Sequence, residues 1–185
     1  MSHASSRLGA VALVGLCCAA AACGAHQQGP STHRATTPAP SCDAFATHGL
    51  AIAIPDREAF RRSVGEPTGV SRTPVANRHI SDQTDTLHVF TRDGLEATYY
   101  VLPRRDLLAS VAVRDPRWLR YGSPTIGSSG AAVEAAFGPP AQRASGGAGP
   151  GLTYTCRRAA GPDEPVVFLM DSGVVREVVF LYYVD

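Results

Sequence analysis

Cysteines carry the most distinct chemistry in this 185-residue sequence. Three lie in or just after an uncharged, alanine-rich run near the amino terminus, and two lie further along the chain. The run, Leu8 to Ala22, is too short to make a good membrane-spanning helix and ends in small residues, as secretory signal peptides do. We therefore predict that residues 1–22 are a signal peptide, which is removed together with Cys17 and Cys18.

Cys23 follows this segment directly. The sequence Ala20-Ala21-Ala22-Cys23-Gly24 resembles the lipobox of bacterial lipoproteins, with Ala20 where leucine is preferred. We predict that Cys23 is acylated and holds the protein on a membrane surface. Cleavage near Ala22 without acylation is the alternative. Glycine rather than aspartate at position 24 is typical of sorting to the outer membrane if the host is Gram-negative.

Cys42 and Cys156 remain in the mature chain. An even number of cysteines in an oxidising compartment favours a disulfide between them. The alternative is two free buried thiols. A bridge that closes so long a loop would stabilise the fold by about 4–5 kcal/mol in the chain-entropy model.

The other residues with catalytic or ligand-binding chemistry do not form known constellations. The Gly-Ser-Ser-Gly stretch at 127–130 lacks the spacing of a hydrolase nucleophile elbow, and its serines fit better as helix caps. The glycine-rich run 146–151 precedes a strand, whereas a phosphate-binding loop precedes a helix. His48, His79 and His88 lack the spacing of metal ligands. We expect a non-enzyme with no metal, cofactor or small-molecule substrate; a hydrolase with an unrecognised site is the alternative.

The composition excludes one class of partner and identifies one unstructured segment. Net charge is +1 and the arginines form no long basic run, which argues against nucleic-acid binding. Residues 23–41 mix proline with Ser, Thr, Gln and His and contain almost nothing apolar. We predict that they form a disordered tether between the lipid and the folded part.

Two capped helices divide the rest of the chain into similar halves. In the clearer one, Ser128 or Ser129 caps the start, and Gly138 followed by two prolines ends the helix. A weaker copy begins at Asp56 and ends before Pro67. Each helix is followed by a stretch expected to be a loop, 68–82 or 141–151. Three strand-like runs then follow in each half: 85–92, 95–102 and 107–114 in the first, and 152–158, 165–171 and 174–184 in the second.

This order of elements predicts an α+β fold made of two repeats, 42–116 and 117–185. Each repeat would be a helix plus a three-stranded meander. The two would pack as one domain, with one antiparallel sheet and the helices on one face.

The sheet face turned away from the helices is the predicted binding surface. If Val111 and Val178 face the helices, that surface is rich in apolar and aromatic residues, and such patches mark interaction sites. We expect Phe90, Tyr100 and Tyr183 to be its anchors. The alternatives are that the segment before the first helix, the connector around Trp118 or a second copy covers this face, or that the strand register is reversed. The predicted set is His88, Phe90, Thr98, Tyr100, Ala112, Thr155, Val167, Leu169, Val179, Leu181 and Tyr183.

The capped-helix stretch from Ile126 to Pro140 is followed by aromatic strand residues such as Tyr154, by Val166-Val167-Phe168 and by the strand from Val174 to Val178. This series resembles the SmpA/OmlA (BamE-like) lipoprotein domain. The tandem plan is similar to that of β-lactamase inhibitor protein and its relatives, and the likeness covers about residues 50–185. BamE-like proteins have one unit rather than two and lack so long a tether.

This resemblance implies a non-enzymatic envelope lipoprotein that binds another protein through its exposed sheet face. A role as an accessory of outer-membrane assembly follows, with the protein facing the periplasm in a Gram-negative host and secreted or surface-anchored otherwise. The alternative is a secreted or membrane-tethered inhibitor of a hydrolase.

Overall fold

In the computed structural model, the helices and strands lie between Cys42 and Leu181. The structure describes residues 39–77, 80, 82–146, 149–156 and 164–182. The predicted signal peptide, Cys23 and most of the predicted tether lie outside these residues. No helix within the described ranges has the length and apolar character needed to cross a bilayer.

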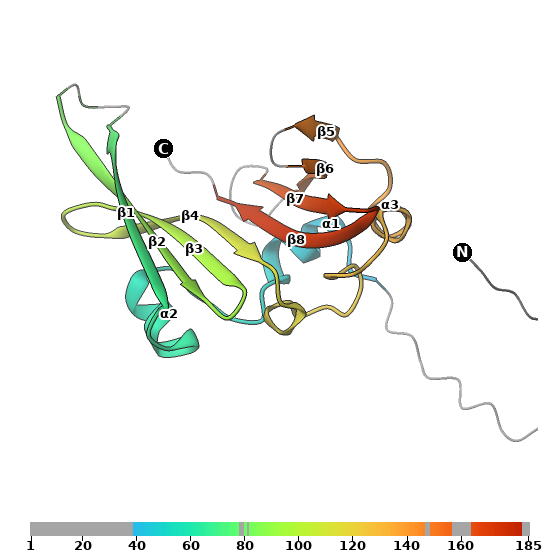
Figure 1. Cartoon of the computed structure of the whole chain (residues 1–185), viewed down its shortest axis with the longest axis horizontal. Coiled ribbons are helices and arrows are strands. Elements are labelled where there is room, and N and C mark those ends of the chain that lie inside the picture. Colours follow the sequence, from blue (N-terminus) through green and yellow to red (C-terminus); the bar gives the residue numbers. More distant parts are fainter. Residues whose placement is uncertain (1–38, 78–79, 81, 147–148, 157–163, 183–185) are drawn as a thin grey trace, which may run out of the picture. The chain divides into compact units, whose positions relative to one another are not determined.

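Eight strands form one antiparallel sheet in the order β1-β2-β3-β4-β8-β7-β6-β5 (Figure 1). The chain builds two four-stranded meanders in turn, and the last strand of each, β4 and β8, pair at the centre of the sheet. We call β1–β4 with the preceding helix the first half, and β5–β8 with its helix the second half. The strands are β1 (Gly69–Ala76), β2 (Thr84–Arg92), β3 (Leu95–Val101), β4 (Asp106–Val113), β5 (Gln142–Gly146), β6 (Gly149–Cys156), β7 (Glu164–Asp171) and β8 (Val174–Leu181).

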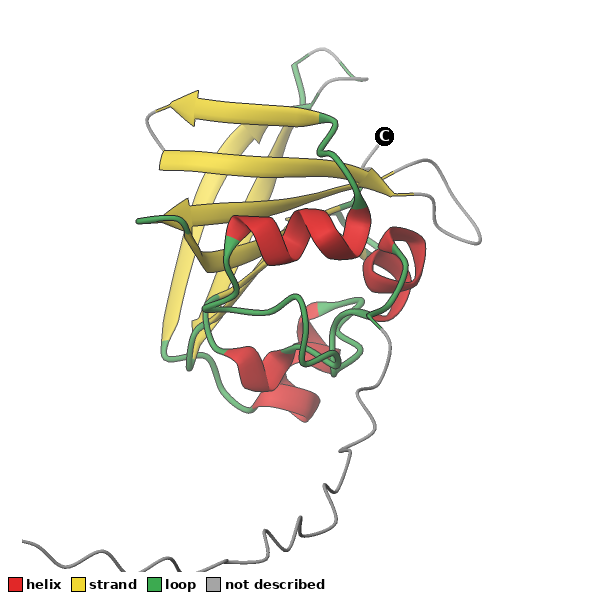
Figure 2. Cartoon of the chain, turned by 90° about the vertical axis from the view of Figure 1, so that its right-hand side faces the viewer, coloured by secondary structure: helices red, strands yellow, loops and turns green. Residues whose placement is uncertain are grey.

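The helices lie on one side of this sheet, as Figure 2 shows. They are α1 (Cys42–His48), α2 (Arg57–Val64) in the first half, α3 (Gly130–Phe137) in the second half, and the short 3-10 helix η1 (Pro116–Trp118) between the halves. The predicted caps are confirmed. Asp56 accepts from the backbone N–H of Ala59 at 2.7 Å, and Ser129 accepts from that of Ala132 at 3.2 Å. Gly138 ends α3 with φ 81°, a conformation that glycine adopts without strain.

The predicted fold class, repeats of one helix and a three-stranded meander, is wrong. Each half contributes four strands, and the described residues are mainly β with three α-helices. The stretches 68–82 and 141–151, which we expected to be loops, contain β1 and β5. Both are edge strands. Most residues of β1 are exposed and Pro74 lies within it, so neither an apolar alternation nor a full set of backbone donors identifies it as a strand.

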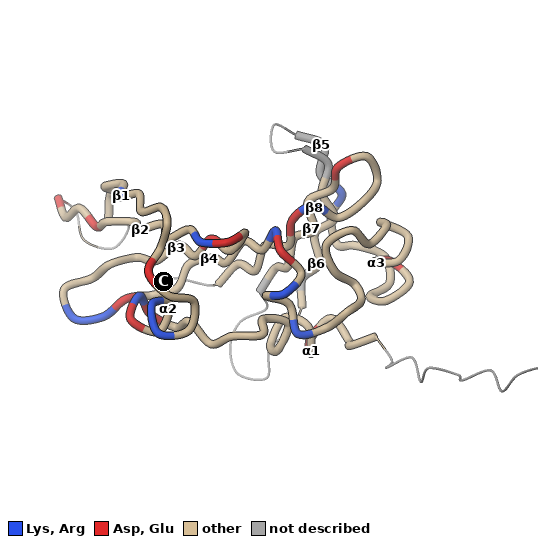
Figure 3. The backbone as a smooth tube through the Cα atoms, turned by 60° about the horizontal axis from the view of Figure 1, so that its bottom comes forward, with Lys and Arg blue, Asp and Glu red and all other residues tan. Residues whose placement is uncertain are grey.

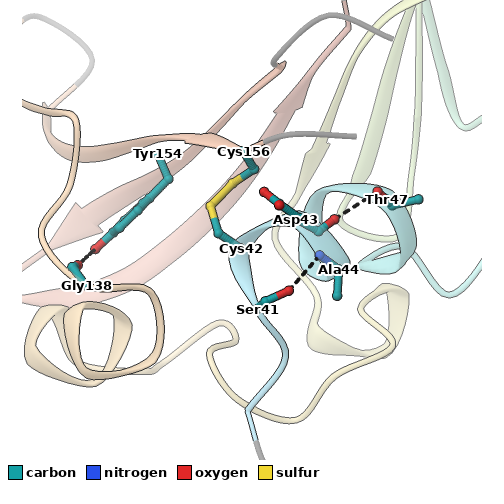
Figure 4. Close-up of a disulfide and its surroundings, with 8 residues drawn as sticks. All are labelled: Ser41, Cys42, Asp43, Ala44, Thr47, Gly138, Tyr154 and Cys156. Carbon is teal, nitrogen blue, oxygen red and sulfur yellow. Dashed lines mark hydrogen bonds between the residues drawn. A yellow bond between two sulfur atoms is a disulfide. The ribbon is translucent and has the colours of Figure 1, made fainter. Parts of the chain in front are cut away.

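Helix α1, at the beginning of the folded unit, contributes an aromatic core side chain to the second half. Phe45 on α1 is 0% exposed, and its ring lies 5.4 Å from that of Phe137, 5.7 Å from that of Phe168 and 5.6 Å from that of Phe180. The predicted disulfide between Cys42 and Cys156 is present and links α1 to the end of β6 (Figure 4). These two residues are 114 positions apart in the sequence. Helix α1 is therefore part of the core of the second half.

The first half is closed by its own helix. Phe60 on α2 packs edge-on against Phe90 of β2 at 5.5 Å, and Phe90 in turn packs against Tyr99 at 6.0 Å. The hydroxyl of Tyr99 donates to the carbonyl of Ile54 at 3.1 Å. Burial, with the nearby carboxylates, raises the pKa of Tyr99 well above its ordinary value, so this hydroxyl keeps its proton.

Candidate protein-binding face

The sheet face that bears no helix is the candidate site. Because side chains alternate along a strand, the register defines which residues lie on it. Val111 and Val178 are both 0% exposed and face the helices, so the condition on which the predicted face depends is met. On β2, β3, β4, β8 and β7, the side chains that point away from the helices form a set that we call the open face. Its apolar members are Leu87, Val89, Tyr100, Leu107, Ala112, Val167, Leu169, Val179 and Leu181.

These side chains are separate from the core beneath the helices. None of the nine belongs to the apolar cluster of buried and partly buried residues on the helix side. Ala112 is covered, at 7% exposure, but the others are partly exposed or exposed, and Leu181 is 36% exposed. The open face therefore presents apolar surface to its surroundings without contributing to the main core.

The register joins the open face across the seam between the two halves. Ala112 of β4 lies opposite Val179 of β8, and Val179 lies opposite Val167 of β7. In the first half, Tyr100 of β3 lies opposite Leu107 of β4. Cross-strand neighbours of this kind are close enough to form a continuous surface. The apolar patch thus extends over strands from both meanders.

An ion cluster borders this patch at one end. Arg114, just after β4, contacts Glu177 of β8 at 2.7 Å and Glu96 of β3 at 3.4 Å. Burial lowers the pKa of Arg114, but its hydrogen bond with Glu177 and the charges of both glutamates raise it overall. Other charged residues gather on α2 and near turns (Figure 3). The open face therefore combines apolar side chains with charged residues at one end, a mixture also found in protein interfaces.

The three predicted anchor residues have different outcomes. Tyr100 lies on the open face and is partly exposed. Phe90 was predicted wrongly: it is 1% exposed and packs between Phe60 and Tyr99 on the helix side. His88, placed on the same face by the sequence, is also on the helix side and is 8% exposed. Tyr183 lies outside the described residues.

The turn between β2 and β3 could have corrected the error. Both faces of β2 carry apolar side chains, so alternation alone does not choose between them. Asp93 and Gly94 form a two-residue turn, which places Arg92 opposite Leu95 and therefore Phe90 opposite Ala97. Since Ala97 faces the helices, Phe90 must do so as well. The same count places Leu87 and Val89 on the open face.

A partly buried cluster of titratable side chains lies at the start of α2. The Nε atom of Arg57 contacts Asp106 Oδ2 at 2.7 Å, and its Nη1 atom lies 3.2 Å from Nδ1 of His88. Burial raises the pKa of Asp106, but hydrogen bonds and charge from Arg57 lower it overall. Burial, together with the charges of Arg57 and Arg72, lowers the pKa of His88. This arrangement favours the neutral form of His88 and docks the start of α2 onto β4.

Possible metal ligands do not converge within the described part of the chain, where no group of three His, Cys, Asp or Glu side chains could hold a metal ion. His48 is on α1 and His88 is on β2 in the first half. His79 lies outside the described residues. The two cysteines of the described part are joined in the disulfide.

Comparisons with known proteins give no family for this chain. No family model matches the sequence, and no curated protein matches it. One solved structure with a similar chain is an extracellular protein containing an SCP domain from Bacillus anthracis str. Ames, at a TM-score of 0.39 and 12% identity. The match covers 68% of this chain and 42% of that one, so this chain spans less than half of that protein's length. A likeness this low assigns no function.

Proposed function

We propose that this protein is a non-enzymatic envelope lipoprotein that binds another protein through the open face. The observation that carries the proposal is the one-sided sheet: helices cover one face, and the described strands expose an apolar patch on the other. Antiparallel sheets that face water normally turn polar residues toward it. A patch of partly exposed apolar side chains is instead typical of an interaction surface.

The dimensions of the open face suit a folded protein as the partner. Its five strands, at about 4.8 Å spacing, span roughly 20 Å. That width is comparable to one side of a standard protein–protein interface. Tyr100 and its neighbour Leu107 are the proposed anchors in the first half, since partly exposed aromatic residues contribute much of the energy of such interfaces. Val167 and Val179 continue the contact in the second half.

The location follows from the cysteines. The disulfide supports folding in an oxidising compartment, and acylation of Cys23 would attach the protein to a membrane. In a Gram-negative host we place it on the outer membrane, facing the periplasm, as an accessory of BamE-like type. In another host it would be secreted or surface-anchored. Replacing Cys23 by Ser should release the protein from the membrane fraction; unchanged fractionation would contradict lipid anchoring.

A second candidate is an inhibitor of a hydrolase, either secreted or tethered. The extent of the open face across both halves favours it, because a wide continuous surface can cover the rim of an enzyme's active site. This candidate predicts a soluble enzyme as the partner, whereas the first predicts a membrane complex.

Partner capture with matched valine variants tests the binding role. Val179→Arg places a charge in the centre of the open face, and Val70→Arg places the same charge on edge strand β1, where Val70 is already 48% exposed. We expect Val179→Arg and Tyr100→Ala to reduce the yield of co-purified partner from host envelope extracts at least about tenfold, while Val70→Arg leaves it unchanged. Quantitative mass spectrometry of the eluate measures this and identifies the partner.

Thermal melts of the three variants provide the control for folding. Equal partner yields for Val179→Arg, Tyr100→Ala and the unmodified protein, with unchanged melting temperatures, would sink the open face as the binding surface. Loss of the partner with Val70→Arg alone would point to the β1 edge instead.

A further inference from the structure

The helix-bearing side of the sheet contains an open pocket of about 420 Å³. It lies beside the segment that joins α1 to α2, and its size is within the range of small-molecule sites. Leu108 of β4 and Tyr182, just after β8, contribute to it from the central strands of the sheet. The lining residues are Ala46, Thr47, His48, Leu50, Ala51, Ile52, Ala53, Ile54, Pro55, Leu108, Arg120 and Tyr182.

Backbone hydrogen bonds fix the walls of this pocket. The N–H of Ala51 donates to Trp118 O at 2.9 Å, and the N–H of Arg120 donates to Gly49 O at 2.8 Å. These bonds flank the bridge between Leu50 and Leu119. Further along the same segment, the Tyr99 hydroxyl holds the carbonyl of Ile54. Hydrogen bonds therefore hold both chain segments that form the walls of the pocket in place.

The lining of the pocket is mainly apolar and carries basic but no acidic side chains. Most of the lining side chains are aliphatic, none is acidic, and two, Arg120 and His48, can carry positive charge. Within the described residues, neither of these two has a side-chain hydrogen bond or an ion pair. The hydrogen bond between Arg120 N and Gly49 O brings their two segments together at the same part of the pocket. An unpaired guanidinium beside apolar surface suits a carboxylate, which it binds through charge-assisted hydrogen bonds.

We propose that this pocket binds a small amphiphilic carboxylate, with an acyl chain of medium length. Arg120 pairs with the carboxylate, His48 supplies a second donor, and the tail lies against Leu50, Ile52 and Leu108. This site is separate from the open face and lies on the opposite side of the sheet. The bound ligand would brace the α1–α2 segment and would leave the open face accessible to a protein partner.

Calorimetric titration with sodium decanoate below its critical micelle concentration tests the proposal. The protein is the disulfide-bonded chain with Cys23 replaced by Ser, so that neither an attached lipid nor detergent competes. We expect saturable binding with one site. Arg120→Gln should weaken it at least about tenfold, which corresponds to the loss of one charge-assisted hydrogen bond. The matched control is Arg104→Gln, which changes an exposed arginine in the turn between β3 and β4 and should leave the affinity unchanged.

Two further arms separate the head group from the tail. Decanol, which lacks the charge, and acetate, which lacks the tail, should each bind at least about tenfold more weakly than decanoate. Ala53→Trp fills the pocket at a position that is already exposed, and it should abolish binding without lowering the melting temperature. Absence of saturable decanoate binding, or equal affinities for Arg120→Gln and Arg104→Gln, would overturn the proposal. Partner capture through the open face is independent of Arg120, so failure here would leave the protein-binding role standing.

Discussion

The two halves of the sheet are the same kind of meander, but different elements cover the helix side of each. In the first half, α2 buries Ala59 and Phe60, and an ion pair between Arg57 and Asp106 fixes its start to β4. In the second half, α3 buries only Val133 fully, and the cover is completed by Phe45 of α1, which a disulfide attaches to β6. One half is closed by local contacts, and the other depends on a segment from the far end of the fold.

This difference assigns a structural role to the N-terminal part of the folded unit. Helix α3 is rich in alanine and offers little apolar volume, so the aromatic rings of β6, β7 and β8 need another partner. Phe45 supplies it, but only if residues more than 100 positions apart meet, which costs chain entropy. We therefore expect the second half to be the more sensitive to changes in its long-range links.

Removal of the disulfide should have the largest effect. The double variant Cys42→Ser, Cys156→Ser loses a link across 114 residues, and the free energy of unfolding should fall by about 4–5 kcal/mol in the chain-entropy model. Urea denaturation measures this. A reductant should lower the urea midpoint of the unmodified protein to that of the double variant, and it should not change the midpoint of the double variant. A loss below about 1 kcal/mol would mean that α1 contributes little to the second half.

Truncation of the two matched phenylalanines compares the halves directly. Phe45 and Phe60 are both 0% exposed, so Phe45→Ala and Phe60→Ala should each cost about 4 kcal/mol. Only Phe45 shares a helix with the disulfide. In the cysteine double variant, the cost of Phe45→Ala should therefore be smaller than in the unmodified protein, while that of Phe60→Ala should stay the same. If loss of the disulfide reduced the cost of Phe45→Ala and the cost of Phe60→Ala by the same amount, a specific role of α1 in the second half would be contradicted.

Asp106→Asn should weaken the first half by about 1–2 kcal/mol at neutral pH, because it removes the negative charge from a partly buried, charge-assisted hydrogen bond with Arg57. The Asp106 side chain is 13% exposed and that of Arg57 is 28% exposed. The matched variant in the second half is Glu134→Gln, which removes the partner of Arg143 in a pair on the surface. We expect no measurable change in unfolding free energy for Glu134→Gln. Urea midpoints for both variants provide the measurement.

The same cluster should make the first half sensitive to acid. His88 has a pKa below its ordinary 6.5 in the folded state, so the unfolded chain binds more protons as the pH falls below that value. The contribution of neutral His88 to stability is therefore fully present above pH 6.5, and it is lost as the pH falls through the folded-state pKa of His88. The lowered pKa of Asp106 adds a further loss below its ordinary 3.8. His88→Gln should flatten the stability profile just below pH 6.5; a profile that keeps its slope would contradict this assignment.

Regular patterning explains which parts of this fold the sequence predicts. The six strands β2, β3, β4, β6, β7 and β8 are found near the predicted ranges because apolar alternation or continuous apolar runs mark them. The helix caps and the disulfide also follow from local or compositional rules. These features each depend on a few neighbouring residues or on simple counting.

The missing elements depend on tertiary context. Edge strands β1 and β5 bury little, and α1 has only seven residues, so its identity depends on Phe45 reaching the second half. Part of the open face was predictable, including Tyr100, Val167 and Val179. Phe90 was misplaced because β2 is apolar on both faces. The pocket beside Arg120 joins segments 70 residues apart in the sequence, and no local motif marks it.

The seam between the halves should be held mainly by packing and backbone pairing, with only a small contribution from charge. Val111 lies opposite Phe180 and Val113 opposite Val178, and all four side chains are buried. Arg114 adds contacts to Glu177 and Glu96, but its side chain is 47% exposed, so Arg114→Gln should cost no more than about 0.5–1 kcal/mol. Salt should screen this contribution, and the difference between Arg114→Gln and the unmodified protein should shrink in 1 M NaCl. A loss well above about 1 kcal/mol that shrinks in 1 M NaCl would mean that the ion cluster, rather than the apolar pairs, joins the two meanders.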